Sequence, residues 1–168
     1  MGKGKGKLEM KSRLTHLDEQ GQARMVDVGA KPITAREARA RVVVKMRPST
    51  LALIQSGAAK KGDVLAIARV AGIQAAKRTP ELIPLCHAIV LTRCEVHFEA
   101  RARAGVLEIE SRVSALDRTG AEMEALTAAA VAALTVYDML KSVDRGMTIN
   151  ELALHEKSGG KSGRYTRP

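Results

Sequence analysis

Apolar and polar residues alternate along several stretches of the chain, a pattern typical of β-strands that bury one face. These stretches are 23–28, 38–46, 94–101, 107–113 and 148–154. The turn residues Ala104-Gly105 separate 94–101 from 107–113. We therefore expect these two stretches to form a hairpin with one face exposed to water.

Three other segments carry the start and stop signals of helices. Pro48 begins a short helix that Gly57 ends, and Gly62-Asp63 caps a longer one. The third helix is alanine-rich and runs over about 122–143. Apolar spacing of three and four places the buried face of the second helix on Val64, Ile67, Ala68, Ala71 and Ala75, and that of the third on Leu126, Ala129, Ala130, Ala133, Leu134 and Tyr137.

The resulting order of elements is β-β-α-α-β-β-α-β. It predicts an α+β fold in which helices pack on one face of an antiparallel sheet. The 168 residues correspond to about one domain by length, and no internal repeat divides them. We therefore expect one domain preceded by a basic leader over residues 1–13.

The composition restricts the class of protein. The chain has no tryptophan and only three aromatic residues, so its core must consist of aliphatic side chains and alanine. Cys86 and Cys94 stand eight positions apart without a CxxC motif, which predicts free thiols and a reducing, cytoplasmic setting. No apolar run approaches the length of a membrane span, so we expect no membrane association.

The net charge of +10 is concentrated at the two ends of the chain. Residues 1–13 carry +4, residues 157–168 carry another +4, and the body between them carries only +2. The body shows no stacking surface of aromatic and basic residues and no pattern of a known RNA-binding module. We therefore favour a solvated leader over a nucleic-acid arm, and keep a basic RNA-binding module as an alternative function.

Titratable side chains occur where apolar segments end. His87 follows an apolar run stiffened by Pro84, and Lys61 stands just ahead of a helix. Asp138 and Lys141 are three residues apart and are neighbours on one helix surface. Each of these residues also has an ordinary structural explanation. His87 can be a core histidine, Lys61 part of a solvated turn, and Asp138 with Lys141 a surface ion pair. For the ion pair, considered alone, we favour the structural explanation.

Glu124 opens the long helix, and a helix dipole alone explains an acid there. Fourteen residues separate it from Asp138, which places the two side chains in similar directions roughly 21 Å apart. One small ligand cannot easily touch both within a single chain. If both matter, either the substrate is extended or a second chain completes the site.

The segment 157–163 is rich in glycine and lysine. Gly160-Lys161-Ser162 matches the end of a Walker A motif, but His155 stands where its first glycine belongs, so we reject a P-loop. Lys157 and Lys161 on a flexible backbone form either a phosphate cradle or a loose cationic end. The remaining histidines show no spacing with cysteines or carboxylates that suits zinc, so we expect no metal site.

Eight blocks of the chain together resemble one known family. They are Leu14-Thr15-His16, Met25-Val26-Asp27-Val28, Lys61-Gly62-Asp63-Val64, Ala71-Gly72-Ile73-Gln74-Ala75-Ala76-Lys77, Leu82-Ile83-Pro84-Leu85-Cys86-His87, Glu122-Met123-Glu124-Ala125-Leu126-Thr127, Tyr137-Asp138-Met139 and Lys157-Ser158-Gly159-Gly160-Lys161-Ser162-Gly163. In this order they closely resemble the cyclic pyranopterin monophosphate synthase family of molybdenum cofactor biosynthesis. The resemblance spans about 14–163, which we take as a single catalytic domain, with 164–168 as a tail.

The resemblance implies a fold, an assembly and a reaction. The expected fold is ferredoxin-like, and the expected assembly is a homohexamer, a trimer of dimers with sites between subunits. The reaction converts 3′,8-cyclo-7,8-dihydroguanosine 5′-triphosphate into cyclic pyranopterin monophosphate and diphosphate, as a phosphorus–oxygen lyase. No cofactor is required, although Mg²⁺ can accompany the triphosphate. A noncatalytic nucleotide-binding relative is the alternative within the family.

The resemblance also assigns roles to residues of this chain. Asp138 is the expected base, with Lys141 beside it and Lys61 as a second candidate acid; His87 is a further catalytic candidate. The expected substrate contacts are Leu85, Cys86, His87, Met123, Glu124 and Glu122, with Lys157 and Lys161 holding the triphosphate. Proton transfers at nitrogen and carbon need such acids and bases.

Overall fold

Five antiparallel strands form a sheet in the computed structural model, which describes residues 17–18 and 20–168. The strands are β1 (Thr34–Lys45), β2 (Leu91–Arg101), β3 (Val106–Asp117), β4 (Thr148–Ser158) and β5 (Tyr165–Thr166), in the order β2-β3-β1-β4-β5. The helices are α1 (Pro48–Gln55), α2 (Val64–Lys77), α3 (Thr79–Leu82) and α4 (Glu122–Leu140), with a 3₁₀ turn over Ala102–Ala104. The predicted leader 1–13 lies outside the described residues.

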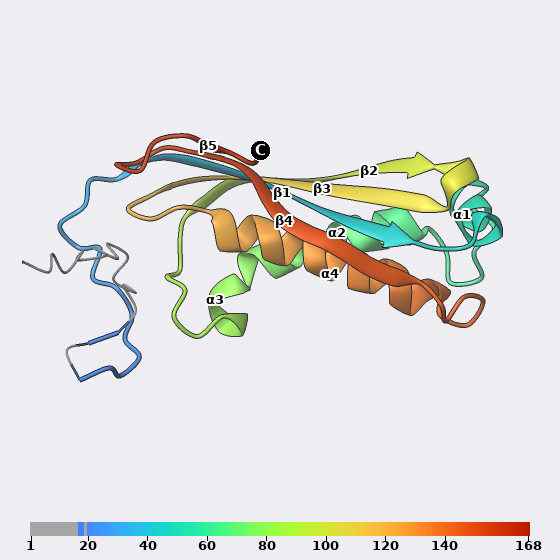
Figure 1. The fold of residues 1–168 in the computed structure, drawn as a ribbon, viewed down its shortest axis with the longest axis horizontal. Helices are drawn as coiled ribbons and strands as arrows, with labels where there is room; N and C mark the ends of the chain where they lie inside the picture. The colour runs from blue at the N-terminus through green and yellow to red at the C-terminus, as the bar shows by residue number, and fades with distance from the viewer. Residues whose placement is uncertain (1–16, 19) are drawn as a thin grey trace, which may run out of the picture.

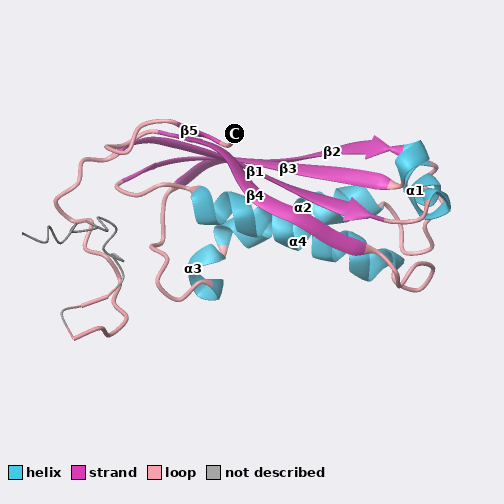
Figure 2. Ribbon diagram, viewed as in Figure 1, coloured by secondary structure: helices cyan, strands magenta, loops and turns pink. Residues whose placement is uncertain are grey.

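The helices α2 and α4 lie along one face of this sheet, and the opposite face is open (Figures 1 and 2). The structure therefore confirms the predicted α+β fold, an antiparallel sheet with helices packed on one side. The predicted hairpin is also present as β2 and β3. Its turn depends on Gly105, whose φ is +62° and whose added Cβ would collide with the Met46 carbonyl oxygen.

The central strand β1 pairs with β3 along its whole length and with β4 on its other side. Its alternating residues Ala38, Ala40, Val42 and Val44 are buried under the helices, as the sequence pattern predicted. The residues between them face the open side of the sheet. Charged residues lie on that side, and none of the described helices or strands forms a second layer over it.

One predicted strand is absent from the described residues: 23–28 has no strand neighbour. It makes a single isolated bridge, between Ala23 and Leu17, and otherwise runs as irregular backbone. Alternation marks a chain that can bury one face, but a strand also requires a partner for its backbone groups. Here the carbonyl of Val26 accepts a hydrogen bond from the His87 ring instead.

The predicted buried face of the long helix is wrong by about one position. The buried residues of α4 are Glu124, Ala125, Ala128, Ala129, Ala132, Ala133, Val136, Met139 and Leu140. Leu134, which we expected in the core, is 57% exposed. A helix that is apolar all round does not reveal its inner face, and packing selected the alanines. On α2, likewise, the predicted core residue Ile67 is exposed.

The helix α4 also corrects the expectation that no segment approaches a membrane span. By length and composition alone it is apolar enough to cross a membrane, and 56% of its apolar window is buried within the fold. A core helix passes the same test. The alanines on its inner face pack against β1, β3 and α2.

The helices α2 and α4 approach each other closely at Gly72. A Cβ at this position would lie 2.8 Å from the Ala128 carbonyl oxygen and 3.1 Å from a methyl group of Val96. The φ of Gly72 is not positive, so the glycine is required by space and not by backbone conformation.

Gly72→Val should lower the free energy of unfolding by about 1 to 3 kcal/mol, because the helix carbonyl of Ala128 cannot move aside freely. The matched control is Gln74→Val on the exposed side of the same helix, which should cost less than about 1 kcal/mol. Urea denaturation of both variants measures the difference. By helix propensity alone Gly72→Val would not lower stability, so a parent-like free energy of unfolding for this variant would show that the close approach does not govern the position.

Candidate functional site

The predicted site residues form two groups at opposite ends of α4. The C-terminal group lies near the end of this helix and consists of Lys61, Asp138 and Lys141. The N-terminal group lies near the start of the helix, at the other end of α4 in Figure 1, and consists of the remaining predicted residues. Since Glu124 and Asp138 are fourteen residues apart on α4, the two groups are separated by roughly 21 Å.

The C-terminal group consists of one carboxylate between two lysines. The Lys141 ammonium lies 2.6 Å from Asp138 Oδ1, and the Lys61 ammonium lies 3.6 Å from Oδ2 and donates to the Asp138 carbonyl at 3.1 Å. The sequence predicted the contact of Asp138 with Lys141, and the structure adds Lys61. Lys61 is brought there by the turn ahead of α2, where the Asp63 side chain caps a first-turn N–H group.

The two lysines hold the Asp138 carboxylate in its ionised form. The hydrogen bond and charge of Lys141, followed by the charge of Lys61, lower the pKa of Asp138. Asp138 in turn raises the pKa of Lys141. All three side chains are about half exposed, so their mutual attraction adds little to stability. The arrangement provides a base next to two acids at an open surface.

Glu124 of the N-terminal group is a buried carboxylate with an unpartnered oxygen. Its side chain is 1% exposed. Its Oε1 accepts a hydrogen bond from the Cys86 thiol at 3.7 Å, whereas Oε2 has no partner among the described residues. Burial raises the pKa of Glu124. A buried acceptor without a donor is costly, so this oxygen points to a ligand that donates to it.

His87 and the loop that carries it are fixed by hydrogen bonds at both ends. The Nε2 of His87 lies 2.7 Å from the Val26 carbonyl, and because a carbonyl only accepts, Nε2 carries the hydrogen. Three residues on, the Val90 N–H donates to Asp117 at 3.0 Å. This N–H and that of Arg118 lower the pKa of Asp117. The sequence patterns did not identify Asp117, although an acid at the end of the alternating strand β3 was a usable signal.

A cavity of about 410 Å³ beside the N-terminal group is lined by five cationic residues. They are Lys31, Arg36, Arg118, Lys157 and Lys161, with Glu37 and Glu122 as the acids. Lys157 is ordered by Glu122 at 2.9 Å and by the Ser162 hydroxyl at 3.1 Å. The sequence predicted only the two tail lysines. The other cations lie within a strand and in loops and follow no motif.

Arg36 is a buried guanidinium without a carboxylate partner among the residues that the structure describes. It is 8% exposed and donates to the carbonyls of Asp117 and Arg118 at 3.3 and 3.2 Å. Burial of a charge without a counter-ion is unfavourable. This arrangement suits an anionic ligand in the adjoining cavity.

The glycine-rich segment after β4 closes over Arg36. Gly159 and Gly160 have φ values of +95° and +70°, and a Cβ on Gly160 would collide with the Arg36 guanidinium. These two glycines are therefore needed both for backbone conformation and for close approach. Gly163 has a similar φ of +67°, but open space surrounds its Cβ position.

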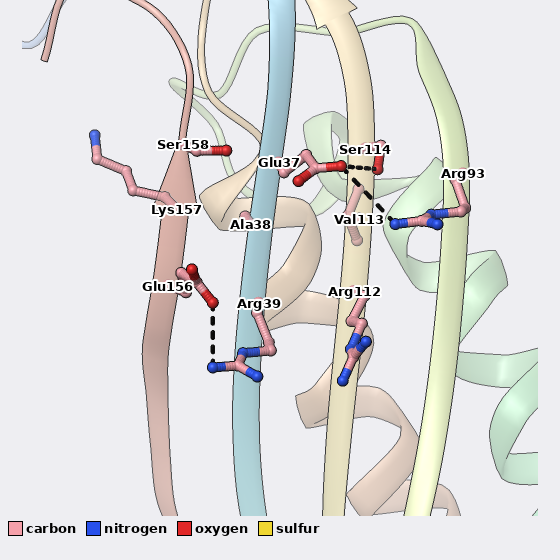
Figure 3. Close-up of a pocket in the computed structure, with 10 residues that line it drawn as sticks. All are labelled: Glu37, Ala38, Arg39, Arg93, Arg112, Val113, Ser114, Glu156, Lys157 and Ser158. Atoms are coloured by element: carbon pink, nitrogen blue, oxygen red, sulfur yellow. Dashed lines mark hydrogen bonds and ion pairs between the residues drawn. The ribbon is translucent and has the colours of Figure 1, made fainter. Parts of the chain in front are cut away.

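A smaller hollow of about 160 Å³ lies on the open face of the sheet (Figure 3). Its cations are already partnered: Arg39 pairs with Glu156 at 3.2 Å and Arg93 with Glu37 at 3.9 Å. Lys157 borders it but points away. This hollow is therefore less suited to an anion than the cationic cavity.

For the other predicted residues the structure gives burial and position. Leu85 and Met123 are half-buried beside Cys86 and Glu124 in the chain, and Lys161 is exposed on the cavity. Cys86 and Cys94 are free thiols, as predicted. Within residues 17–18 and 20–168, no three His, Cys, Asp or Glu side chains are grouped so that they would hold a metal.

Comparisons with known proteins place this chain among similar sequences. The sequence model of the MoaC family matches residues 25–160. A cyclic pyranopterin monophosphate synthase of Thermomicrobium roseum is 64% identical over 93% of this chain and 94% of the relative. Proteins of the same name from Chloroflexus aurantiacus and Parvibaculum lavamentivorans are 58% and 56% identical, over 95% and 91% of this chain and 98% and 96% of those relatives.

Gly160→Ala should displace the Arg36 guanidinium and weaken binding of inorganic diphosphate about tenfold, the loss expected for one charged hydrogen bond. Gly163→Ala is the matched control, since it has nearly the same φ but meets no neighbouring atom. Titration calorimetry with diphosphate compares the two. If both variants bind like the parent chain, the cavity under the glycines is not the anion site.

Proposed function

The chain belongs to the MoaC family, and we propose that it is a cyclic pyranopterin monophosphate synthase. The family resemblance indicated by the sequence motifs is thus confirmed. The proposed reaction converts 3′,8-cyclo-7,8-dihydroguanosine 5′-triphosphate into cyclic pyranopterin monophosphate and diphosphate, in molybdenum cofactor biosynthesis. Its class is that of a phosphorus–oxygen lyase. The observation that carries the proposal is a buried carboxylate oxygen of Glu124 that no described residue partners, near a cationic cavity.

We assign the triphosphate to the cationic cavity. Lys157 and Lys161 bind it from the tail, and Arg36 and Arg118 bind it from the sheet side. A sugar hydroxyl attacks the α-phosphorus, a new O–P bond forms, and the bond to the bridging oxygen breaks, so that diphosphate leaves. The cations stabilise the charge that develops on the departing group. The hydroxyl proton passes to a base.

We assign the guanine-derived part of the substrate to the region around Glu124. The Oε2 of Glu124, which has no partner among the described residues, accepts an N–H of the ring system. Glu122 lies two positions earlier on α4 and orders Lys157. Leu85, Cys86, His87 and Met123 complete the contacts as the family resemblance implies. Nε2 of His87 is engaged by the Val26 carbonyl, so Nδ1 is the ring nitrogen left for a ligand.

Asp138 is the proposed base of the ring rearrangement, with Lys141 and Lys61 as the acids. The two lysines keep the carboxylate ionised and can return protons to nitrogen or carbon. These three residues lie too far from Glu124 to act on the same small substrate within one chain. We therefore propose that a neighbouring subunit supplies one of the two groups.

We propose a homohexamer, arranged as a trimer of dimers, as the assembly that completes the site. The outward faces of α2 and α4 support an oligomer, because Val70 is 67% and Leu134 is 57% exposed although both are apolar. No resident cofactor is proposed, and Mg²⁺ enters only with the triphosphate. We place the enzyme in the cytoplasm, with no membrane or nucleic-acid partner.

Two alternatives are weaker. The similarity to the named synthases runs over more than nine-tenths of the chain and favours an enzyme over a basic RNA-binding module. A noncatalytic relative would bind the nucleotide without turnover. Diphosphate release from the cyclic dihydro-GTP intermediate therefore separates it from the synthase.

Asp138→Asn, Lys61→Ala and Lys141→Ala should each reduce turnover at least about a hundredfold while the fold is kept, because each removes a proton-transfer group. The measurement is diphosphate release from the cyclic dihydro-GTP intermediate, together with the fluorescence of the oxidised pterin. Lys60→Ala, which changes the neighbouring exposed lysine, is the control and should be as active as the parent. Parent-like turnover in any of the three variants removes that residue from the mechanism.

Two inactive variants should complement each other if the site is shared between subunits. Glu124→Gln and Asp138→Asn chains, dissociated and reassembled together, form interfaces at which one site has both residues intact. Turnover should therefore reappear in the mixture and not in either variant alone. Mixed oligomers that form but stay inactive would place both groups in the same chain's site.

A further inference from the structure

The Cys86 thiol makes a hydrogen bond that the proposed reaction does not account for. Cys86 lies in the loop between α3 and β2, where its N–H donates to the Ile83 carbonyl at 3.0 Å. This turn places Sγ 3.7 Å from Glu124 Oε1, and 3.6 Å from the His87 carbonyl. The carboxylate comes from the first turn of α4. The thiol therefore joins the loop to the helix at the buried end of the site.

The thiol has the protonation state of a donor. Burial, followed by the charge and hydrogen bond of Glu124, raises the pKa of Cys86 to about 11. At neutral pH the sulfur keeps its hydrogen, and a nucleophilic role would require the thiolate. The S–H has two acceptors within reach, and the carboxylate is the stronger one because it is charged.

Only one oxygen of Glu124 is occupied by this contact. Oε1 receives the S–H, and Oε2 is buried with no partner among the described residues. A carboxylate held at one oxygen cannot rotate freely about its last torsion, so the direction of the other oxygen is fixed. Without the thiol, either oxygen can turn toward the ligand and neither direction is preferred.

We propose that Cys86 is a positioning residue, whose S–H fixes Glu124 Oε1 so that Oε2 takes an N–H donor of the substrate's guanine-derived ring. The inference rests on the proposed function for the identity of the ligand, but not for the thiol–carboxylate contact itself. The same hydrogen bond lowers the pKa of Glu124, against the larger effect of burial that raises it. Cys86 thereby also favours the ionised carboxylate that accepts the N–H.

The kinetic test compares Cys86→Ala with Cys86→Ser. The alanine variant should lose about five- to tenfold in kcat/KM, the range of a single hydrogen bond to a charged group. The acid limb of its pH profile of kcat/KM should shift to higher pH, because loss of the donor raises the pKa of Glu124. Serine keeps a donor and should restore both values in part. Glu122, Asp117 and His87 are unchanged in both variants, so their charges do not cause the shift.

Cys94→Ala is the matched control for loss of a thiol. Cys94 lies on β2 near Lys77 and Glu95, and the thiol that donates to Glu124 is that of Cys86. This variant should keep the parent's kcat/KM and pH profile. If Cys86→Ala has the same profile as Cys94→Ala, Cys86 does not position the carboxylate, and the proposal is overturned.

A spectroscopic test does not require turnover and so separates this inference from the proposed function. In the Cys94→Ala background Cys86 is the only thiol, and its infrared S–H stretching band reports the acceptor. Donation to a carboxylate lowers the frequency of this band, so Glu124→Gln and Glu124→Ala should raise it. A band that is unchanged in both variants would refute the contact, even in an enzyme that turns over normally.

Discussion

The close contact of small side chains along α4 is the constraint on which the rest of the structure depends. Alanines at the inner face allow this helix to lie against the sheet, and Gly72 allows α2 to lie against it in turn. Larger residues would separate the layers and weaken their dispersion contacts. The same helix carries Glu124 near its start and Asp138 near its end. Its packing therefore fixes the positions of both proposed functional groups.

The sequence predicted those features that a local pattern determines. Alternation located β1, β2 and β3, and the Asp63 cap located the start of α2. The sequence did not determine which face of α4 is buried. Nearly all positions of this helix are apolar, and only packing against the sheet decides which face lies inside. The segment 23–28 has the pattern of a strand, but among the described residues only Leu17 pairs with it, through a single bridge.

The candidate site was predicted unevenly for a related reason. Asp138 and Lys157 belong to family motifs, which are local in sequence and identify these residues by themselves. Arg36 lies on the same face of β1 as Ala38 and Ala40, where a charged residue follows no motif, and only the fold shows that the glycine-rich segment closes over it. The partnership of Cys86 with Glu124 likewise joins segments 38 residues apart. Such contacts depend on tertiary packing, which spacing along the chain does not encode.

The Oε2 of Glu124, unpaired among the described residues, has a consequence for how stability and binding are linked. A buried acceptor without a donor lowers the stability of the unliganded fold, and a ligand that donates to it relieves that penalty. Arg36, buried with no carboxylate partner in the described part of the chain, acts in the same direction toward an anion. The protein therefore keeps two unfavourable buried groups at the place that we assign to the substrate. Selection for thermal stability alone would favour the replacement of these two residues, and would remove the proposed site with them.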